Sequence, residues 1–127
     1  MRFAVVFLLV LGGCASVPGP EQPAPVEEPA ATTTKPENIA VAGLMDTARA
    51  DVAANRLGSA AATLERALRI EPRNPRLWHE LARVRLRQGD YAQAESTAAR
   101  SNTLAGADGE LRAANQRIIE ESRSARR

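Results

Sequence analysis

The sequence predicts an all-α protein, built as a short array of antiparallel helix pairs that follows a signal peptide and a disordered linker. Three observations carry this prediction. Apolar residues in the second half of the chain recur at helical spacing, capping and turn residues separate the helical stretches, and the pattern repeats after about 34 residues. Prolines and glutamates dominate the segment before this region. We therefore predict a helical domain at residues 39–123 and a short basic tail at residues 124–127, with fraying of the chain end from Ser122 onward.

The start of the chain, residues 1–13, is typical of an export signal. Arg2 is followed by the apolar run of residues 3–11, which is too short to span a bilayer as a helix but suits the core of a signal peptide. The run ends in Leu11-Gly12-Gly13-Cys14, which resembles the bacterial lipobox. That resemblance implies cleavage before Cys14 and attachment of lipid to its sulfur. The alternative, a buried core cysteine after a short hydrophobic helix, lacks neighbours that could form such a core.

Residues 14–38 are predicted to comprise the lipidated cysteine and a proline-rich linker. Six of the eight prolines lie here, with four glutamates and a single lysine. Because the segment has few bulky apolar residues, burial cannot offset the entropy of ordering it, and we predict disorder. Proline favours an extended chain of about 3.1 Å per residue, so the linker would reach roughly 75 Å. It serves either as a tether that holds the repeats away from a membrane or as a generic spacer.

Five helices are predicted, at about residues 37–54, 58–70, 75–88, 91–104 and 109–123. The third has the clearest signals. Asn74 can cap it, and Pro75 suits its first position, where a missing N–H costs nothing. Leu77, Leu81 and Val84 recur at i, i+4 and i+7, and so place one apolar stripe on this helix.

A turn joins the third helix to the fourth. Gly89 supplies the positive φ that ends the third helix. Asp90 opens the fourth, with Gln93 three residues on, as in a capping box. Ala94 and Ala98 are small enough to let the two helices pack closely. Residues 75–104 are therefore predicted to form a helical hairpin.

The other helices follow from repetition of this hairpin. A shift by one repeat length pairs Asn55 with Gly89 at the turn and Asn74 with Asp108 at the start of a helix. It also pairs apolar positions along the earlier and later helices: Leu44 with Trp78, Ala48 with Ala82, Leu77 with Leu111, and Val84 with Ile118. The last two pairs belong to a half-length third copy. We predict that this copy is a C-terminal capping helix.

A helix–turn–helix period of about 34 residues resembles the tetratricopeptide repeat. Residues 41–74 and 75–108 carry the family's large and small residues, namely Leu44, Ala48, Ala60, Leu64, Ala67 and Pro72, then Trp78, Leu81, Ala82, Gly89, Tyr91 and Ala94. Asp51 and Arg85 depart from the pattern because the family usually has an aromatic residue there, and Gly106 replaces the closing proline. By helical packing position, Trp78 is expected to belong to the core.

The resemblance implies that the first helix of each pair lines a concave face on which a partner binds. Arg49, Arg83 and Arg117 hold equivalent places in three such helices and are predicted to form a ladder along this groove. The other predicted partner-binding residues are Arg76, His79, Leu86 and Arg87. Because guanidinium groups bind carboxylates in a bidentate way, the predicted ligand is an acidic segment or a C-terminal carboxylate. The alternative is an ordinary solvated, charged helix face.

Residue types that carry chemistry are scarce. His79 is the only histidine, Cys14 is the only cysteine, and the adjacent Glu120 and Glu121 point apart on a helix. No phosphate-binding loop, nucleophile arrangement or metal-ligand spacing occurs in the sequence. We therefore expect no enzyme activity, no cofactor and no metal. A net charge of +2 gives no reason to expect nucleic-acid binding.

The overall architecture resembles that of the LpoP-type outer-membrane lipoproteins, because it combines a lipobox, a proline-rich tether and a short repeat domain. Lipoproteins of this type activate class A penicillin-binding proteins in peptidoglycan synthesis. The resemblance implies an adaptor on the periplasmic face of the outer membrane, held there by the lipid on Cys14. Its expected partner is an envelope protein of this synthase class. Two alternatives stay open: a pilotin or assembly-factor lipoprotein for a pilus, secretin or other envelope complex, and an accessory subunit of an enzyme that has no activating role.

Overall fold

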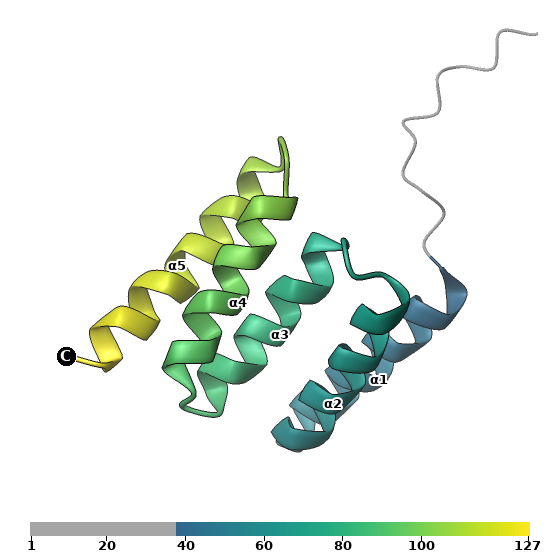
Figure 1. The fold of residues 1–127 in the computed structure, drawn as a ribbon. Helices are drawn as coiled ribbons and strands as arrows, with labels where there is room; N and C mark the ends of the chain where they lie inside the picture. The colour runs from purple at the N-terminus through teal and green to yellow at the C-terminus, as the bar shows by residue number, and fades with distance from the viewer. Residues whose placement is uncertain (1–37) are drawn as a thin grey trace, which may run out of the picture. The chain divides into compact units, whose positions relative to one another are not determined.

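The structure, a computed structural model, describes residues 38–127, which fold into five α-helices joined by short loops (Figure 1). The predicted signal peptide, the linker up to residue 37 and the proposed lipidation site at Cys14 lie outside the described residues. The helices are α1 (Ile39–Ala53), α2 (Leu57–Ile70), α3 (Pro75–Arg87), α4 (Tyr91–Leu104) and α5 (Gly109–Ala125). No strand occurs in this region, so the predicted all-α fold is confirmed.

Side-chain caps begin the helices, and left-handed turn residues follow their ends, as the sequence predicts. Asn74 accepts a hydrogen bond from the Arg76 N–H at 3.0 Å, and Asp90 accepts one from the Gln93 N–H at 3.3 Å. At the two hairpin turns, Asn55 has φ 58° and Gly89 has φ 77°. These two positions, which are equivalent in the repeat, therefore also share a left-handed backbone conformation.

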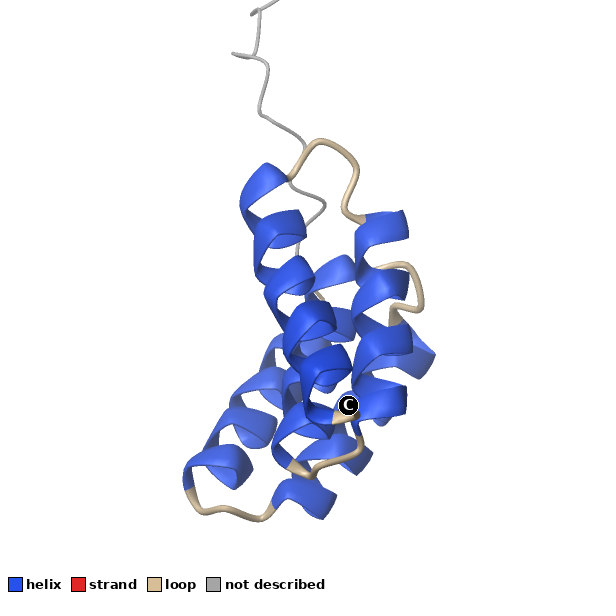
Figure 2. Ribbon diagram, turned by 90° about the vertical axis from the view of Figure 1, so that its left-hand side faces the viewer, coloured by secondary structure: helices blue, strands red, loops and turns tan. Residues whose placement is uncertain are grey.

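The helices form two antiparallel hairpins and a closing helix (Figures 1 and 2). Helices α1 and α2 form the first hairpin, α3 and α4 form the second, and α5 packs against both α4 and α3. As a result α1, α3 and α5 run in the same direction. They are the first helices of successive repeats.

Two apolar clusters hold the array together, and α3 contributes to both. The first joins α1, α2 and α3 through side chains such as Val41, Leu64 and Leu77, each at most 1% exposed. The second joins α3 and α4 to α5 through small alanines and the side chains of Ile118 and Ile119. Burying α5 in this way leaves its outer face polar, as a capping helix requires.

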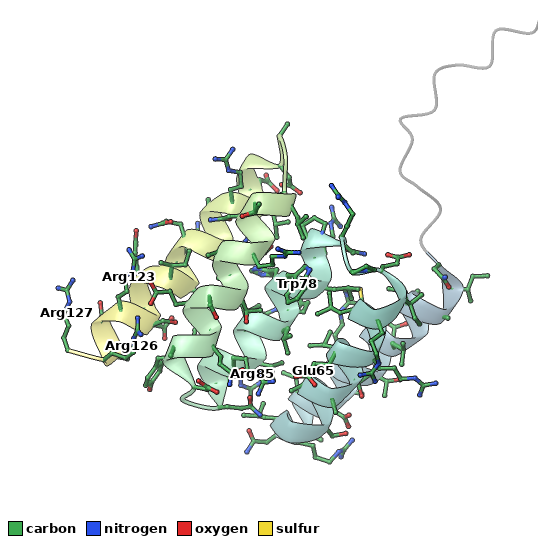
Figure 3. All side chains as sticks on the ribbon, viewed as in Figure 1. Glu65, Trp78, Arg85, Arg123, Arg126 and Arg127 are labelled. Atoms are coloured by element: carbon green, nitrogen blue, oxygen red, sulfur yellow. The ribbon has the colours of Figure 1, made fainter. Side chains whose placement is uncertain are left out.

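The C-terminal helix continues two residues beyond its predicted end. Arg123 donates a hydrogen bond to Glu95 of α4 at 2.7 Å, and Arg126 also forms an ion pair with Glu95. The hydrogen bond from Arg123 is the main cause that lowers the pKa of Glu95. Contacts with α4 thus accompany the extension of the helix into the predicted basic tail, and its fraying stays a prediction (Figure 3).

The two charged departures from the repeat pattern, Asp51 and Arg85, are ion-pair positions in the structure. Asp51 is 6% exposed and accepts hydrogen bonds from Ser59 Oγ at 2.7 Å and from Arg56 Nη2 at 2.6 Å. Arg85 forms an ion pair with Glu65 of α2, so it joins the two hairpins (Figure 3). Charged contacts therefore replace the aromatic packing that is usual at these positions.

We expect the Asp51 cluster to make the fold sensitive to acid. The hydrogen bond from Ser59, followed by that from Arg56, holds the pKa of Asp51 below its ordinary value of about 3.9. Because the folded-state pKa is lowered, the stabilisation is complete above about pH 4 and is lost as the pH falls further. The Asp51→Asn variant should have a lower Tm at pH 7 and a flatter loss of Tm between about pH 4 and pH 2 than the parent chain. Circular dichroism melts over this pH range measure both effects.

Asp46→Asn is the matched control, because the Asp46 side chain is 75% exposed and lies on the same helix. If both variants changed the loss of Tm at acidic pH equally, a specific role for Asp51 would be contradicted.

Ser122 of α5 has the one buried side-chain polar atom that lacks a hydrogen-bond partner within residues 38–127. A buried hydroxyl without a partner costs about 1–3 kcal/mol of desolvation. We therefore expect Ser122→Ala to raise the free energy of unfolding by about 1 kcal/mol, measured by urea unfolding. The control is Ser124→Ala, on the exposed side of the same helix. A destabilised Ser122→Ala variant would contradict this prediction, because it would show that the hydroxyl has a hydrogen-bond partner in solution.

A membrane-spanning helix is not found in the part of the chain that the structure describes.

Candidate functional site: a groove formed by α1, α3 and α5

Three adjoining hollows lie along the face formed by α1, α3 and α5, and together we call them the groove. The first has a volume of about 610 Å³ and lies over the first halves of α3 and α5, next to α1. Its lining is Ala42, Met45, Asp46, Arg49, Arg76, His79, Glu80, Asp108, Glu110, Leu111 and Ala114. It is therefore the part of the groove to which all three parallel helices contribute.

The other two hollows flank the second half of α3. The second, of about 180 Å³, lies between α1 and α3 and has an apolar floor that includes Met45, Val52 and Val84. The third, of about 330 Å³, lies between α3 and α5 and is lined in part by Leu86 and Ile118. Arg83 and Arg87 of α3 line both of these hollows.

All the predicted partner-binding residues line this groove. The structure brings together Arg49, Arg76, His79, Arg83, Leu86, Arg87 and Arg117 from three helices. Their role in binding a partner stays a prediction.

The arginines do not form a simple ladder of free cations. Arg49 pairs with Asp46 at 3.1 Å, and Arg83 pairs with Glu80 at the same distance. The guanidinium-bearing side chains remain 61% and 57% exposed, respectively. Exposed pairs of this kind contribute only about 0.2–1 kcal/mol, so an external carboxylate can replace the internal partner.

Arg87 has a different environment from the other groove arginines. It donates to the carbonyl oxygen of Val52 at 3.3 Å and to Asn55 Oδ1 at 3.4 Å. These contacts connect α3 to the turn that ends α1. Arg76 and Arg117, in contrast, form no ion pair with any side chain of residues 38–127.

Sequence reasoning missed the carboxylates of the groove. These are Asp46, Glu80, Asp108, Glu110 and Glu121. A signal for two of them was present, because Asp46 and Glu80 hold equivalent places in the repeat and each precedes a groove arginine by three positions. The repeat therefore contains an acid–arginine pair, and not an arginine alone.

Sequence reasoning also missed a buried polar network behind the groove. Asn115 of α5 is 0% exposed, and its Nδ2 donates to Ser101 Oγ at 2.7 Å and to Asn102 Oδ1 at 2.9 Å. Ser101 Oγ donates in turn to the carbonyl oxygen of Pro75 at 2.7 Å. Both N–H groups of the Asn115 amide are thus used within the α4–α5 interface.

This network determines how His79 faces the groove. His79 Nδ1 lies 2.7 Å from Asn115 Oδ1. A carbonyl oxygen can only accept a hydrogen bond, so Nδ1 carries the proton and donates it. In the neutral ring, Nε2 is then an acceptor, and His79 lines both the first and the third hollow. The network therefore positions a groove residue and also attaches α5 to α3 and α4.

Trp78 is half-buried at the edge of the first apolar cluster, so its predicted core role is confirmed in part. Its Nε1 donates to the carbonyl oxygen of Pro72 at 2.8 Å, and the Arg100 guanidinium lies 5.7 Å from the ring centroid. Trp78 lines a separate hollow that also contains Glu65 and Arg85 (Figure 3). The tryptophan therefore does not contribute to the groove.

Comparison with known proteins places this architecture in a family. Residues 51–118 match the family model of the tetratricopeptide repeat. The chain belongs to the tetratricopeptide repeat family. Its fold is thus that of a protein-interaction domain, and the groove is formed by the first helices of the two hairpins and by the closing helix α5.

One solved structure is similar to this tetratricopeptide repeat protein over most of its length. It is the globular C-terminal domain of P. aeruginosa LpoP, which is 40% identical, with a TM-score of 0.69. The similarity covers 70% of this chain and 84% of the LpoP domain. The LpoP-type resemblance is therefore confirmed. A comparison with curated proteins gives no match.

Within residues 38–127, no three or more His, Cys, Asp or Glu side chains are grouped so that they would hold a metal ion.

Proposed function

We propose that this chain is an outer-membrane-anchored periplasmic lipoprotein whose tetratricopeptide repeats activate a class A penicillin-binding protein. The observation that carries the proposal is the similarity to the LpoP C-terminal domain, at 40% identity over 70% of the chain. The lipobox-like start and the proline-rich linker support it, because they match the architecture of LpoP-type lipoproteins.

The proposed mechanism is tethered recognition. Lipid on Cys14 would confine the chain to one membrane surface, and the linker of residues 14–38 would set its reach. Confinement of this kind makes the encounter with a partner effectively intramolecular and raises the local concentration of the domain. The groove then binds the synthase better in its active than in its inactive conformation, which shifts the synthase towards activity. The chain itself contributes no reacting group in this scheme.

A reconstituted synthesis assay tests the proposal. The full chain is added to the class A penicillin-binding protein of the same bacterium in detergent, and the rate of glycan polymerisation from lipid-linked precursor is measured. We expect the rate to rise several-fold. An unchanged rate at saturating concentrations of the chain would contradict the activator function.

Two further measurements test the anchor and the alternative partner. Mass spectrometry of the chain from membranes should find a lipidated Cys14 as the first residue, and an unmodified Cys14 would contradict the anchor. Crosslinking in the periplasm followed by affinity purification should recover the synthase as the main partner. Recovery of a secretin or pilus component instead would favour a pilotin role.

A further inference from the structure

Charge is unevenly distributed in the groove. The first hollow has four carboxylates, from Asp46, Glu80, Asp108 and Glu110, against the two arginines Arg49 and Arg76. In the second hollow, Arg49, Arg83 and Arg87 face the single carboxylate of Glu80. In the third, Arg83, Arg87 and Arg117 face that of Glu121. The groove thus has an acidic half, the first hollow, and a basic half, the second and third hollows.

The two halves follow one another along α3. The acidic half lies over the first part of the helix, around Arg76 to Glu80, and the basic half lies over the second part, from Arg83 to Arg87. At about 1.5 Å per residue, Arg76 and Arg87 are roughly 16 Å apart along the helix. An extended segment of about five residues spans this length.

The basic half also offers an apolar site. The floor of the second hollow consists of Met45, Ala48, Val52, Leu64 and Val84, and three arginines surround it. Methionine adapts its shape to different side chains because it is unbranched. An acidic segment with one leucine-like side chain would therefore fill this hollow while its carboxylates meet the arginines.

We propose that the groove binds its partner in one direction. A short segment of the partner protein lies along α3, with acidic residues and an apolar anchor over the basic half and with basic residues over the acidic half. This inference rests on the proposed function, because the segment belongs to the protein that the chain activates. It replaces the simpler expectation of a purely acidic ligand.

Electrostatics explains why one direction is favoured. In the proposed direction, partner carboxylates replace Asp46 and Glu80 at exposed, weakly held arginines. In the reverse direction, partner carboxylates would face Asp108 and Glu110, and partner cations would face Arg87 and Arg117. Placing like charges opposite one another is unfavourable, so the groove discriminates by repulsion as well as by attraction.

A synthetic peptide tests this without the synthase. The probe has roughly seven residues, with Glu-Leu-Glu at one end, two lysines at the other and two alanines between, so that the centres of its charged ends lie about 15 Å apart. One version has a photo-crosslinking group at the acidic end, and a second version has it at the lysine end. After binding to the full chain, the crosslinked positions are identified by mass spectrometry.

We expect the acidic end to crosslink near residues 83–87 and 117–121, and the lysine end near residues 46, 76–80 and 108–111. Crosslinks at the same positions from both ends would overturn the single direction. A peptide that does not bind would overturn the proposed ligand chemistry.

Charge reversal provides the second arm of the test. Arg83→Glu combined with Arg117→Glu should weaken peptide binding about tenfold, measured by fluorescence anisotropy at low salt. Arg117→Glu alone should give a smaller loss, and it disturbs no ion pair within residues 38–127. The control is Arg66→Glu, the same change at an exposed position of α2 outside the groove. Circular dichroism verifies that each variant keeps its helicity.

Equal binding by the control and the groove variants would overturn the inference. Failure of the inference differs from failure of the proposed function. If the chain stimulates glycan synthesis but does not orient the peptide, only the proposal of directional binding fails. If the chain orients the peptide but does not stimulate the synthase, only the proposed activator function fails.

Discussion

Replacing Leu77 with alanine should lower the free energy of unfolding by about 2–5 kcal/mol. Leu77 is 0% exposed and lies in the apolar cluster that joins α3 to the first hairpin. The change removes three buried carbon atoms and leaves a cavity that rigid helices fill only partly. A small domain has a total stability of about 5–15 kcal/mol, so the loss is a large fraction of it. Thermal unfolding should show a Tm lower by about 10–30 °C.

Ile70→Ala is the control for this prediction, because it also shortens a branched apolar side chain, but at a position that is 43% exposed. Its Tm should change by only a few degrees. Similar losses in the two variants would mean that the packing of Leu77 does not hold the hairpins together.

Asn115→Ala should be the most damaging polar substitution in the described region. The change removes the acceptor for His79 Nδ1 and the donor for Ser101 Oγ and Asn102 Oδ1. Each buried group that is left without a partner costs about 1–3 kcal/mol, and we expect a total loss near 3 kcal/mol in the free energy of unfolding. Because the network attaches α5 to α3 and α4, hydrogen exchange should accelerate first at the backbone amides of α5.

The neighbouring Gln116→Ala provides the comparison, since Gln116 is exposed and its side chain bonds only Glu120 of its own helix among residues 38–127. A double-mutant cycle with His79→Ala should give a coupling energy above about 0.5 kcal/mol. Additive effects would show that His79 and Asn115 act independently, and would remove the argument that the network orients the groove histidine.

These two residues illustrate how differently core positions can be read from a sequence. Leu77 was predictable, because its spacing from Leu81 and Val84 places it on an apolar stripe. Asn115 was not, since a polar residue in a helix is ordinarily solvated, and nothing local to α5 indicates its partners. Those partners lie 13–36 residues away in the chain and meet Asn115 only when α3, α4 and α5 pack.

Helix bounds and turns followed from the sequence because their causes are local. Asn74 and Asp90 cap the helices they precede, and the left-handed conformations of Asn55 and Gly89 need only the residues themselves. Because the pattern repeats along the chain, the prediction for one hairpin could be extended to the whole array. All five helices accordingly end within two residues of their predicted bounds.

The sequence by itself determined that this protein is a short stack of tetratricopeptide repeats whose first helices share a set of arginines. Only the tertiary structure decided how the charges of different helices combine in the groove. Asp46 lies on α1, Glu80 on α3, and Asp108 and Glu110 at the start of α5, and these carboxylates become neighbours only on folding. Residue spacing reports the periodicity of one helix, whereas the potential of a groove depends on every helix that lines it. For that reason the arginine positions were predictable and the division of the groove into acidic and basic halves was not.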